Sequence, residues 1–249
     1  MKIRTLFIAM LSTLAVACNY NAESGSNSDS TFRIMTYNVG AINKFVGEDF
    51  SKEDNVKLLA DIIKESQSDA VAFQELDSCN ARNNFFQLKA VAEATGKDWT
   101  YFYGPAIDYR GGKYGTGVAA KGKQPIKTLY IPIPVKEKSE PRVLTIAEYK
   151  DYVLACTHLN GGQPAQVEFL TAEIMKLYGD SKKPVFLGGD MNANVGKDMM
   201  NKFCENWTII SQTELGSTVV TVTKPCIDFI LQLNNKAKPV KVLGSAVIK

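Results

Sequence analysis

The chain has very little histidine. His158 is its single histidine among 249 residues. Hydrolytic sites that use one histidine often use a second, so a site built mainly on imidazoles is not expected. A serine or cysteine hydrolase is excluded too, because there is no Gly-x-Ser-x-Gly segment and one histidine leaves nothing to activate a nucleophile. A buried structural role for His158, donating to a backbone carbonyl, stays open.

Other absences narrow the function further. The net charge of +3 is too small to indicate a nucleic-acid binder, although it permits an anionic substrate. The cysteines beyond the N-terminal segment fit no zinc-ligand spacing: Cys79, Cys156, Cys204 and Cys226. There is no internal repeat and no interior linker. The composition, 45% hydrophobic and 22% charged, is that of one globular domain.

The N-terminal segment has the order of a secretory signal. Lys2 and Arg4 precede an apolar run at 6–14, and small residues lead to Cys18. The run is too short for a transmembrane helix. The ending Ala-Val-Ala-Cys resembles a bacterial lipobox, so we predict a lipoprotein signal peptide at 1–18 with lipidation of Cys18. A plain secretory signal cleaved near residue 17 is the alternative.

Residues 19–31 are polar and small, which indicates a flexible tether, so we expect 1–30 to lie outside the fold. Export would then place the protein in the periplasm or on the cell surface, as a monomer anchored to the membrane by lipid. The folded domain is expected at 32–249.

Hydrophobic periodicity predicts an α/β domain. Apolar residues recur at helical spacing in 53–66, 83–96 and 164–179. Strands are indicated by short apolar or β-branched runs, and Lys150-Asp151 is a plausible tight hairpin turn. These runs are 32–39, 69–76, 100–104, 116–121, 128–133, 142–149, 152–159, 184–193, 226–233 and 239–248. We therefore predict two mostly antiparallel sheets packed face to face, with helices outside.

Polar residues gather at the ends of several predicted strands. They are Asn38, Glu75, His158, Asp190 and Asn192. Each alone has a structural explanation, such as a turn residue or a helix cap. A buried polar group is costly unless it is paired, so their joint occurrence favours strand ends that converge on one site.

The segments TYNV, FQELDS, YGTGVAAK, THL, GGDMNA and CIDFIL occur in this order. Together they resemble the endonuclease/exonuclease/phosphatase superfamily of metal-dependent phosphoesterases. The resemblance covers about residues 32–249, and its most specific marks are Gln-Glu and Gly-Asp-x-Asn. It implies a DNase I-like four-layer α/β sandwich and the hydrolysis of phosphate esters.

The resemblance also implies roles for the site residues. Glu75 would hold a divalent cation, with Asn38 supporting it, and Mg²⁺ is expected because hard oxygen ligands suit it, with Mn²⁺ or Ca²⁺ as alternatives. Asp190 would orient or deprotonate the attacking water. Asn192 would donate to a phosphoryl oxygen, and an extended segment would point it the same way as Asp190.

Three further residues match the family pattern. His158 matches a histidine that contacts the phosphate or helps the leaving group, and Asp228 matches a carboxylate that orients a second histidine. Arg142 lies in a Glu-Pro-Arg segment and is a candidate substrate-binding residue, with a surface cation as the alternative. Thr116 stands where asparagine is common.

The pattern departs from the family at its C-terminal end. Family members close with Ser-Asp-His and a last strand, whereas this sequence ends at GSAVIK. We expect the natural chain to continue into that segment. The alternative is a complete chain whose catalytic activity is strongly reduced. The competing function is a non-catalytic surface lipoprotein that binds phosphate-bearing ligands. Nucleic acid, a lipid head group and a small molecule all stay open as the substrate.

Overall fold

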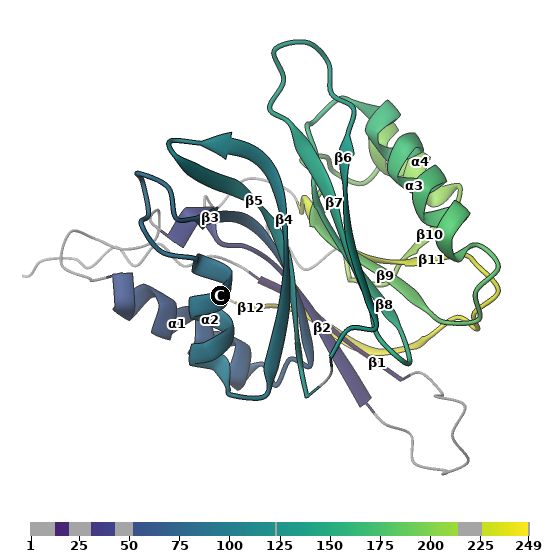
Figure 1. Cartoon of the computed structure of the whole chain (residues 1–249). Coiled ribbons are helices and arrows are strands. Elements are labelled where there is room, and N and C mark those ends of the chain that lie inside the picture. Colours follow the sequence, from purple (N-terminus) through teal and green to yellow (C-terminus); the bar gives the residue numbers. More distant parts are fainter. Residues whose placement is uncertain (1–12, 20–30, 43–51, 123, 214–225, 249) are drawn as a thin grey trace, which may run out of the picture.

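A computed structural model of the chain describes residues 13–19, 31–42, 52–122, 124–213 and 226–248. Two six-stranded sheets pack against each other, and helices cover their outer faces (Figure 1). Among the described residues there are four α-helices, two beside each sheet. The prediction of a two-sheet α/β sandwich is confirmed.

The first sheet has the strand order β12-β1-β2-β3-β5-β4. Only the β2–β3 pair is parallel. Its strands are β1 Thr13–Asn19, β2 Thr31–Asn38, β3 Ala70–Ser78, β4 Trp99–Tyr109, β5 Gly112–Lys121 and β12 Lys241–Ile248. Helices α1 Lys52–Glu65 and α2 Gln87–Thr95 pack on its outer face.

The second sheet has the order β10-β11-β9-β8-β7-β6, and only β8 and β9 run parallel. Its strands are β6 Lys127–Ile133, β7 Arg142–Glu148, β8 Val153–His158, β9 Val185–Asp190, β10 Trp207–Ile209 and β11 Asp228–Leu233. Helices α3 Pro164–Tyr178 and α4 Asp198–Cys204 cover it. The tight turn predicted at Lys150-Asp151 joins β7 to β8.

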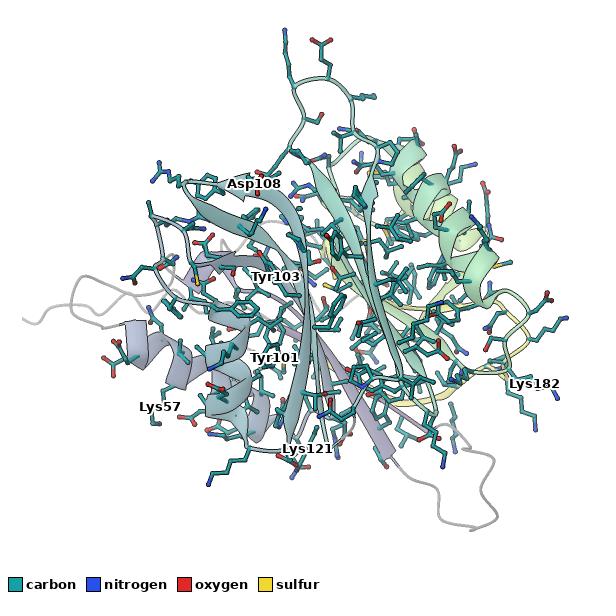
Figure 2. All side chains as sticks on the ribbon, in the orientation of Figure 1. Lys57, Tyr101, Tyr103, Asp108, Lys121 and Lys182 are labelled. Carbon is teal, nitrogen blue, oxygen red and sulfur yellow. The ribbon has the colours of Figure 1, made fainter. Side chains whose placement is uncertain are left out.

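Alternating side chains build the core in layers, because successive residues of a strand face opposite sides of its sheet. Phe32, Tyr152 and Phe186 lie between the two sheets. The rings of Phe32 and Tyr152 are 4.5 Å apart. On the outer face of the first sheet, Tyr101 and Tyr103 pack edge-on against Phe86, and both lie beside α2 (Figure 2).

The helix predictions hold with shifted limits. The helix predicted at 83–96 begins only at Gln87, because Phe86 is held in a β-bridge with Ser78. Helix α4 and the short strand β10 were not predicted. No helix among the described residues combines the length and the apolar character that crossing a membrane requires.

The N-terminal segment differs from expectation. Thr13–Asn19 forms β1, between β2 and β12, although residues 1–30 were expected outside the fold. The run TLAVACN is apolar and β-prone, which suits a strand flanked on both sides. Residues 1–12 and 20–30, where most of the predicted signal peptide and tether fall, lie outside the described residues. The signal peptide and lipidation of Cys18 stay predictions.

Candidate active site

Four of the predicted site residues share one end of the sandwich because each lies where a strand ends or begins. Asn38 ends β2, His158 ends β8, Asp190 ends β9 and Asp228 begins the antiparallel β11. His158 and Asp228 are each in register with Asp190, one on either side. Residues in register on neighbouring strands project to the same face, so these three side chains form a row facing the other sheet.

Glu75 reaches this end through an irregularity in β3. The pairing of β3 with β5 shifts register between Phe73 and Leu76, as in a β-bulge, and Glu75 has a φ of 57°. Gln74 fills the buried position beneath it, where its amide donates to Thr36 and to the Ala72 carbonyl. A positive φ is costly for a residue with a side chain, and such strain is typical of functional sites.

Asn38 connects the two carboxylates. Its Nδ2 donates to Glu75 Oε1 at 3.1 Å and to Asp190 Oδ2 at 3.0 Å. Its Oδ1 accepts from the backbone N–H of Gly40 at 3.1 Å, which fixes the orientation of the amide. Asn38 thus holds a carboxylate from each sheet at one position, and its own oxygen is engaged by the backbone.

Asn192 reaches the site by a turn, so the extended segment predicted after Asp190 is wrong. Asn192 has a φ of 47°, a left-handed conformation that asparagine tolerates better than most residues. Its backbone N–H donates to Asp190 Oδ1 at 2.9 Å, an Asx-type bond that closes the turn. Its Nδ2 donates to the Leu159 carbonyl at 3.0 Å and lies 3.0 Å from His158 Nε2.

The ring of His158 is buried between Arg142 and Asp190. Burial lowers the pKa of His158, although the Asp190 carboxylate opposes this shift, so the ring is neutral. Arg142 Nη1 lies 3.2 Å from Nδ1 and Asn192 Nδ2 lies 3.0 Å from Nε2, so a donor faces each ring nitrogen, and the tautomer decides which nitrogen accepts. Nε2 is 3.8 Å from Asp190 Oδ2. The donors of Arg142 and Asn192 therefore gather around the ring of His158, which suits an anion.

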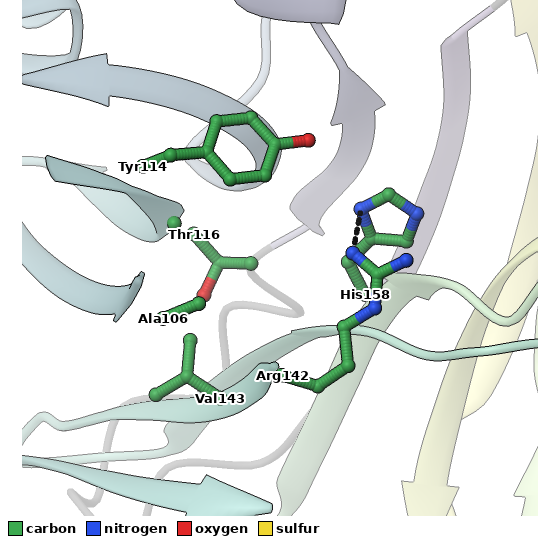
Figure 3. A pocket seen from close by; sticks show the side chains of 7 residues that line it. Ala106, Tyr114, Thr116, Arg142, Val143 and His158 are labelled. Carbon is green, nitrogen blue, oxygen red and sulfur yellow. Dashed lines mark hydrogen bonds between the residues drawn. The ribbon is translucent and has the colours of Figure 1, made fainter. Parts of the chain in front are cut away.

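A cleft between the sheets adjoins these donors. It is lined by Ala106, Tyr114 and Thr116 from the first sheet and by Arg142, Val143 and His158 from the second (Figure 3). The Tyr114 hydroxyl points toward the side of the cleft where His158 and Arg142 lie (Figure 3). Burial raises the pKa of Tyr114 well above its usual value, so its hydroxyl stays neutral and able to donate.

The available oxygen ligands suit a hard divalent cation. The described part of the chain has no group of three or more His, Cys, Asp or Glu side chains placed to hold one metal ion. Glu75 is partly exposed, and Asn38 ties it to Asp190. Mg²⁺ keeps several waters and needs only one or two protein carboxylates, so this set fits Mg²⁺ better than Zn²⁺, which prefers nitrogen and sulfur.

A sequence model described as the Endonuclease/Exonuclease/phosphatase family matches residues 35–231, which include every residue of this site. The chain belongs to this family. Its members are hydrolytic phosphoesterases, in agreement with a site of paired carboxylates and anion donors. Among curated protein sequences there is no match.

Solved structures of the family share this fold. A mannosyl-6-phosphatase of Bacteroides thetaiotaomicron has a TM-score of 0.63 at 14% identity, covering 80% of this chain and 84% of that one. A Bacteroides vulgatus endonuclease/exonuclease/phosphatase gives 0.58 at 16%, covering 80% and 86%. The human Nocturnin catalytic domain with bound sulfate gives 0.58 at 17%, covering 81% and 82%.

The structure brings the seven predicted residues of the domain together and adds neighbours that sequence reasoning missed. Arg142 is not a surface cation, because its side chain is only 10% exposed. The missed neighbours are Tyr114, Glu140 and Asn160. Two of them could have been found from the sequence, because Glu140 and Asn160 each lie two residues from a predicted site residue.

Proposed function

We propose that this protein is a divalent-cation-dependent hydrolase of phosphate esters. The observation that carries the proposal is the joining of Glu75 and Asp190 through one amide, with the donors of Arg142 and Asn192 gathered around His158 beside them. Carboxylates can hold a cation and activate water, while the donors suit phosphoryl oxygens.

The residues then take distinct roles. Asp190, held by Asn38 and by the backbone of Asn192, orients and deprotonates the attacking water. Arg142 and Asn192 donate to the phosphoryl oxygens as their negative charge grows. The neutral ring of His158 contacts the phosphoryl group or helps the leaving oxygen. Asp228, opposite Asp190, supports the same end of the site.

Glu75 is the residue that would hold the cation, and Asn38 would keep its carboxylate in place. When bound, Mg²⁺ would neutralise charge on the phosphoryl oxygens and stabilise the departing oxygen. Mn²⁺ and Ca²⁺ are the alternative ions, because the same oxygen donors accept them.

The similar structures support phosphate esters as the class of substrate and do not narrow it further. The similar Bacteroides thetaiotaomicron protein is a mannosyl-6-phosphatase, and the similar human Nocturnin domain has a bound sulfate anion, which supports an oxyanion ligand. Nucleic acid, a lipid head group and a small phosphorylated molecule are each compatible with this chemistry. We also propose export and a membrane anchor through lipid on Cys18, with a monomeric domain.

Hydrolysis of bis-p-nitrophenyl phosphate, p-nitrophenyl phosphate, plasmid DNA and sphingomyelin, measured with and without Mg²⁺, tests the function. We expect activity that EDTA abolishes and Mg²⁺ restores. Glu75→Gln and Asp190→Asn should each lower kcat/KM by roughly 100-fold or more, since each removes charge needed in the transition state.

Glu65→Gln serves as the matched control, because Glu65 is an exposed carboxylate at the end of α1. It should keep wild-type activity. Activity that survives both site substitutions would contradict the proposal. Binding of phosphate without hydrolysis by the wild type would favour a non-catalytic binding protein instead.

A further inference from the structure

Glu140 and Arg142 form an ion pair at the mouth of the site. Arg142 Nη1 donates to Glu140 Oε1 at 2.5 Å, and the same nitrogen faces His158 Nδ1. The arginine side chain is 10% exposed, whereas that of Glu140 is 45% exposed. The guanidinium therefore belongs to the interior of the site, while the carboxylate reaches it from the solvent side.

Arg142 does not depend on Glu140 for its position. Its Nε donates to Asn160 Oδ1 at 2.9 Å. Asn160 is fixed in turn, because its backbone N–H donates to Gln166 Oε1 and its Nδ2 donates to the backbone carbonyl of Glu140, both at 2.9 Å. The guanidinium keeps this support when the carboxylate of Glu140 moves away.

The backbone of Glu140 is fixed, although its side chain is exposed. The loop between β6 and β7 is pinned by Gln163, which accepts from the Lys136 N–H at 3.2 Å and donates to Ser139 Oγ at 2.9 Å. Asn160 holds the Glu140 carbonyl, and Pro141 restricts the backbone of Glu140, the residue before it. The main chain thus holds Glu140 beside Arg142, while the exposed side chain can turn its carboxylate into solvent.

We propose that the Glu140 carboxylate is an internal competitor for the anion that binds Arg142. It occupies the guanidinium in the free protein and must move away when a phosphate group binds. Its repulsion of a phosphate grows with the charge of that phosphate, so it makes the site selective for monoanionic phosphodiesters over dianionic phosphomonoesters. The inference rests on the proposed function in taking Arg142 as a contact of the phosphoryl group.

Glu140→Gln tests this in the full chain with Mg²⁺, because glutamine keeps the size and removes the charge. We expect KM for bis-p-nitrophenyl phosphate, a monoanion, to fall roughly threefold, as removal of one charge about 6 Å away in water predicts. KM for p-nitrophenyl phosphate at pH 8, a dianion, should fall roughly tenfold, because the same removal acts on twice the charge. The kcat values should change little, and added salt should weaken both effects.

Glu137→Gln is the matched control, since Glu137 is an exposed carboxylate of the same loop. It should leave both KM values within roughly 1.5-fold of the wild type, because its charge is solvated and screened. Glu140→Ala provides a second variant with the same expected direction. The melting temperature of each variant shows whether it is folded.

A rise of KM in Glu140→Gln would overturn the proposal, because it would mean that Glu140 positions Arg142. Unchanged KM values, or equal effects of Glu137→Gln and Glu140→Gln, would overturn it too.

Calorimetric binding of inorganic phosphate separates this inference from the proposed function. If the protein hydrolyses no phosphate ester, the proposed function is wrong. Tighter binding of phosphate by Glu140→Gln than by the wild type and Glu137→Gln would still support the proposal that Glu140 competes for Arg142. If no variant binds phosphate more tightly than the wild type, the proposal that Glu140 competes for Arg142 is wrong, even if the protein is an active enzyme.

Discussion

Asp77 is a fully buried carboxylate with three side-chain donors around it. Arg82 donates to it twice, from Nε and Nη2, each at 2.8 Å, and Asn83 Nδ2 donates at 2.6 Å. Burial pushes the pKa of Asp77 upward, but the hydrogen bonds from Arg82, Asn83 and Asn80 outweigh burial and lower it below the usual value. The carboxylate lies two residues beyond Glu75 and ties β3 to the loop that follows it.

We predict that Asp77→Asn lowers the free energy of unfolding by about 2 kcal/mol at pH 7, the scale of hydrogen bonds to a charged group. Because the folded pKa is depressed, the stabilisation is present above the unfolded pKa, near 4, and is lost as pH falls through the folded pKa. Urea unfolding from pH 7 down to pH 3 should therefore show the gap between variant and wild type closing below about pH 4.

Asp61→Asn is the control for this measurement. Asp61 pairs with Lys57 and Lys64 on the surface of α1, and exposed pairs of this kind contribute little. It should unfold almost as the wild type does at every pH. An Asp77→Asn gap that stays constant down to pH 3 would show that the carboxylate charge is not what stabilises this loop.

At the scale of elements, the closeness of the two sheets decides whether the site exists. The sheets approach tightly where β9 crosses β2 and β3. A Cβ on Gly188 would lie 2.7 Å from Ala72 Cβ and 3.3 Å from Thr36 Cβ. Asp190 lies two residues further along β9, and Asn38 two residues beyond Thr36, so this contact sets the separation of the groups that Asn38 joins.

We predict that Gly188→Ala destabilises the fold by roughly 1–3 kcal/mol, the usual cost of overpacking a core. It should also lower kcat, because the sheets must separate to admit the methyl group. Urea unfolding and hydrolysis of bis-p-nitrophenyl phosphate measure the two effects. Gly244→Ala on β12 is the control, since its Cβ would meet nothing within 4 Å. Equal stability of the two variants would contradict this account of the contact.

The elements themselves were largely predictable, with instructive exceptions. Short apolar runs place Asn38, His158 and Asp190 correctly at strand ends, because that pattern is local, whereas Asp228 was predicted inside a strand at 226–233 and begins β11. The bulge that turns Glu75 inward arises from pairing with β5, far along the chain, and left no local signal. The turn at Asn192 depends on its bond back to Asp190, so an extended continuation was the wrong prediction.

At the scale of the whole molecule, the N-terminal segment connects folding with export. Cleavage before Cys18 would remove residues 13–17 of β1, and β1 is the only neighbour of β12 in its sheet among the described strands. We predict that the mature protein begins at a lipidated Cys18 and fractionates with membranes. The intact mass of the membrane-extracted protein checks both the cleavage and the lipid.

Cys18→Ser should release the protein from the membrane fraction, because the acceptor of the lipid is gone. Cys79→Ser is the matched control, since Cys79 is an exposed free cysteine of the folded domain, and it should stay with the membranes. A Cys18→Ser protein that still fractionates with membranes would contradict lipidation. Faster hydrogen exchange of β12 in the mature protein than in the full chain would show that β1 had been lost from the sheet.

The sequence by itself determined the family, the sandwich architecture and most residues of the site, because strand periodicity and short motifs are local patterns. Only the tertiary structure decided the order of the strands, the amide that joins Glu75 to Asp190 and the carboxylate that competes for Arg142. Glu140 and Arg142 are only two positions apart, and the fold decides whether their side chains meet. Asn38 and Asp190 are 152 positions apart and meet because the two sheets pack against each other, while β1 and β12 pair across a still longer separation. Contacts at such separations are set by the fold and leave no mark on the residues around each partner.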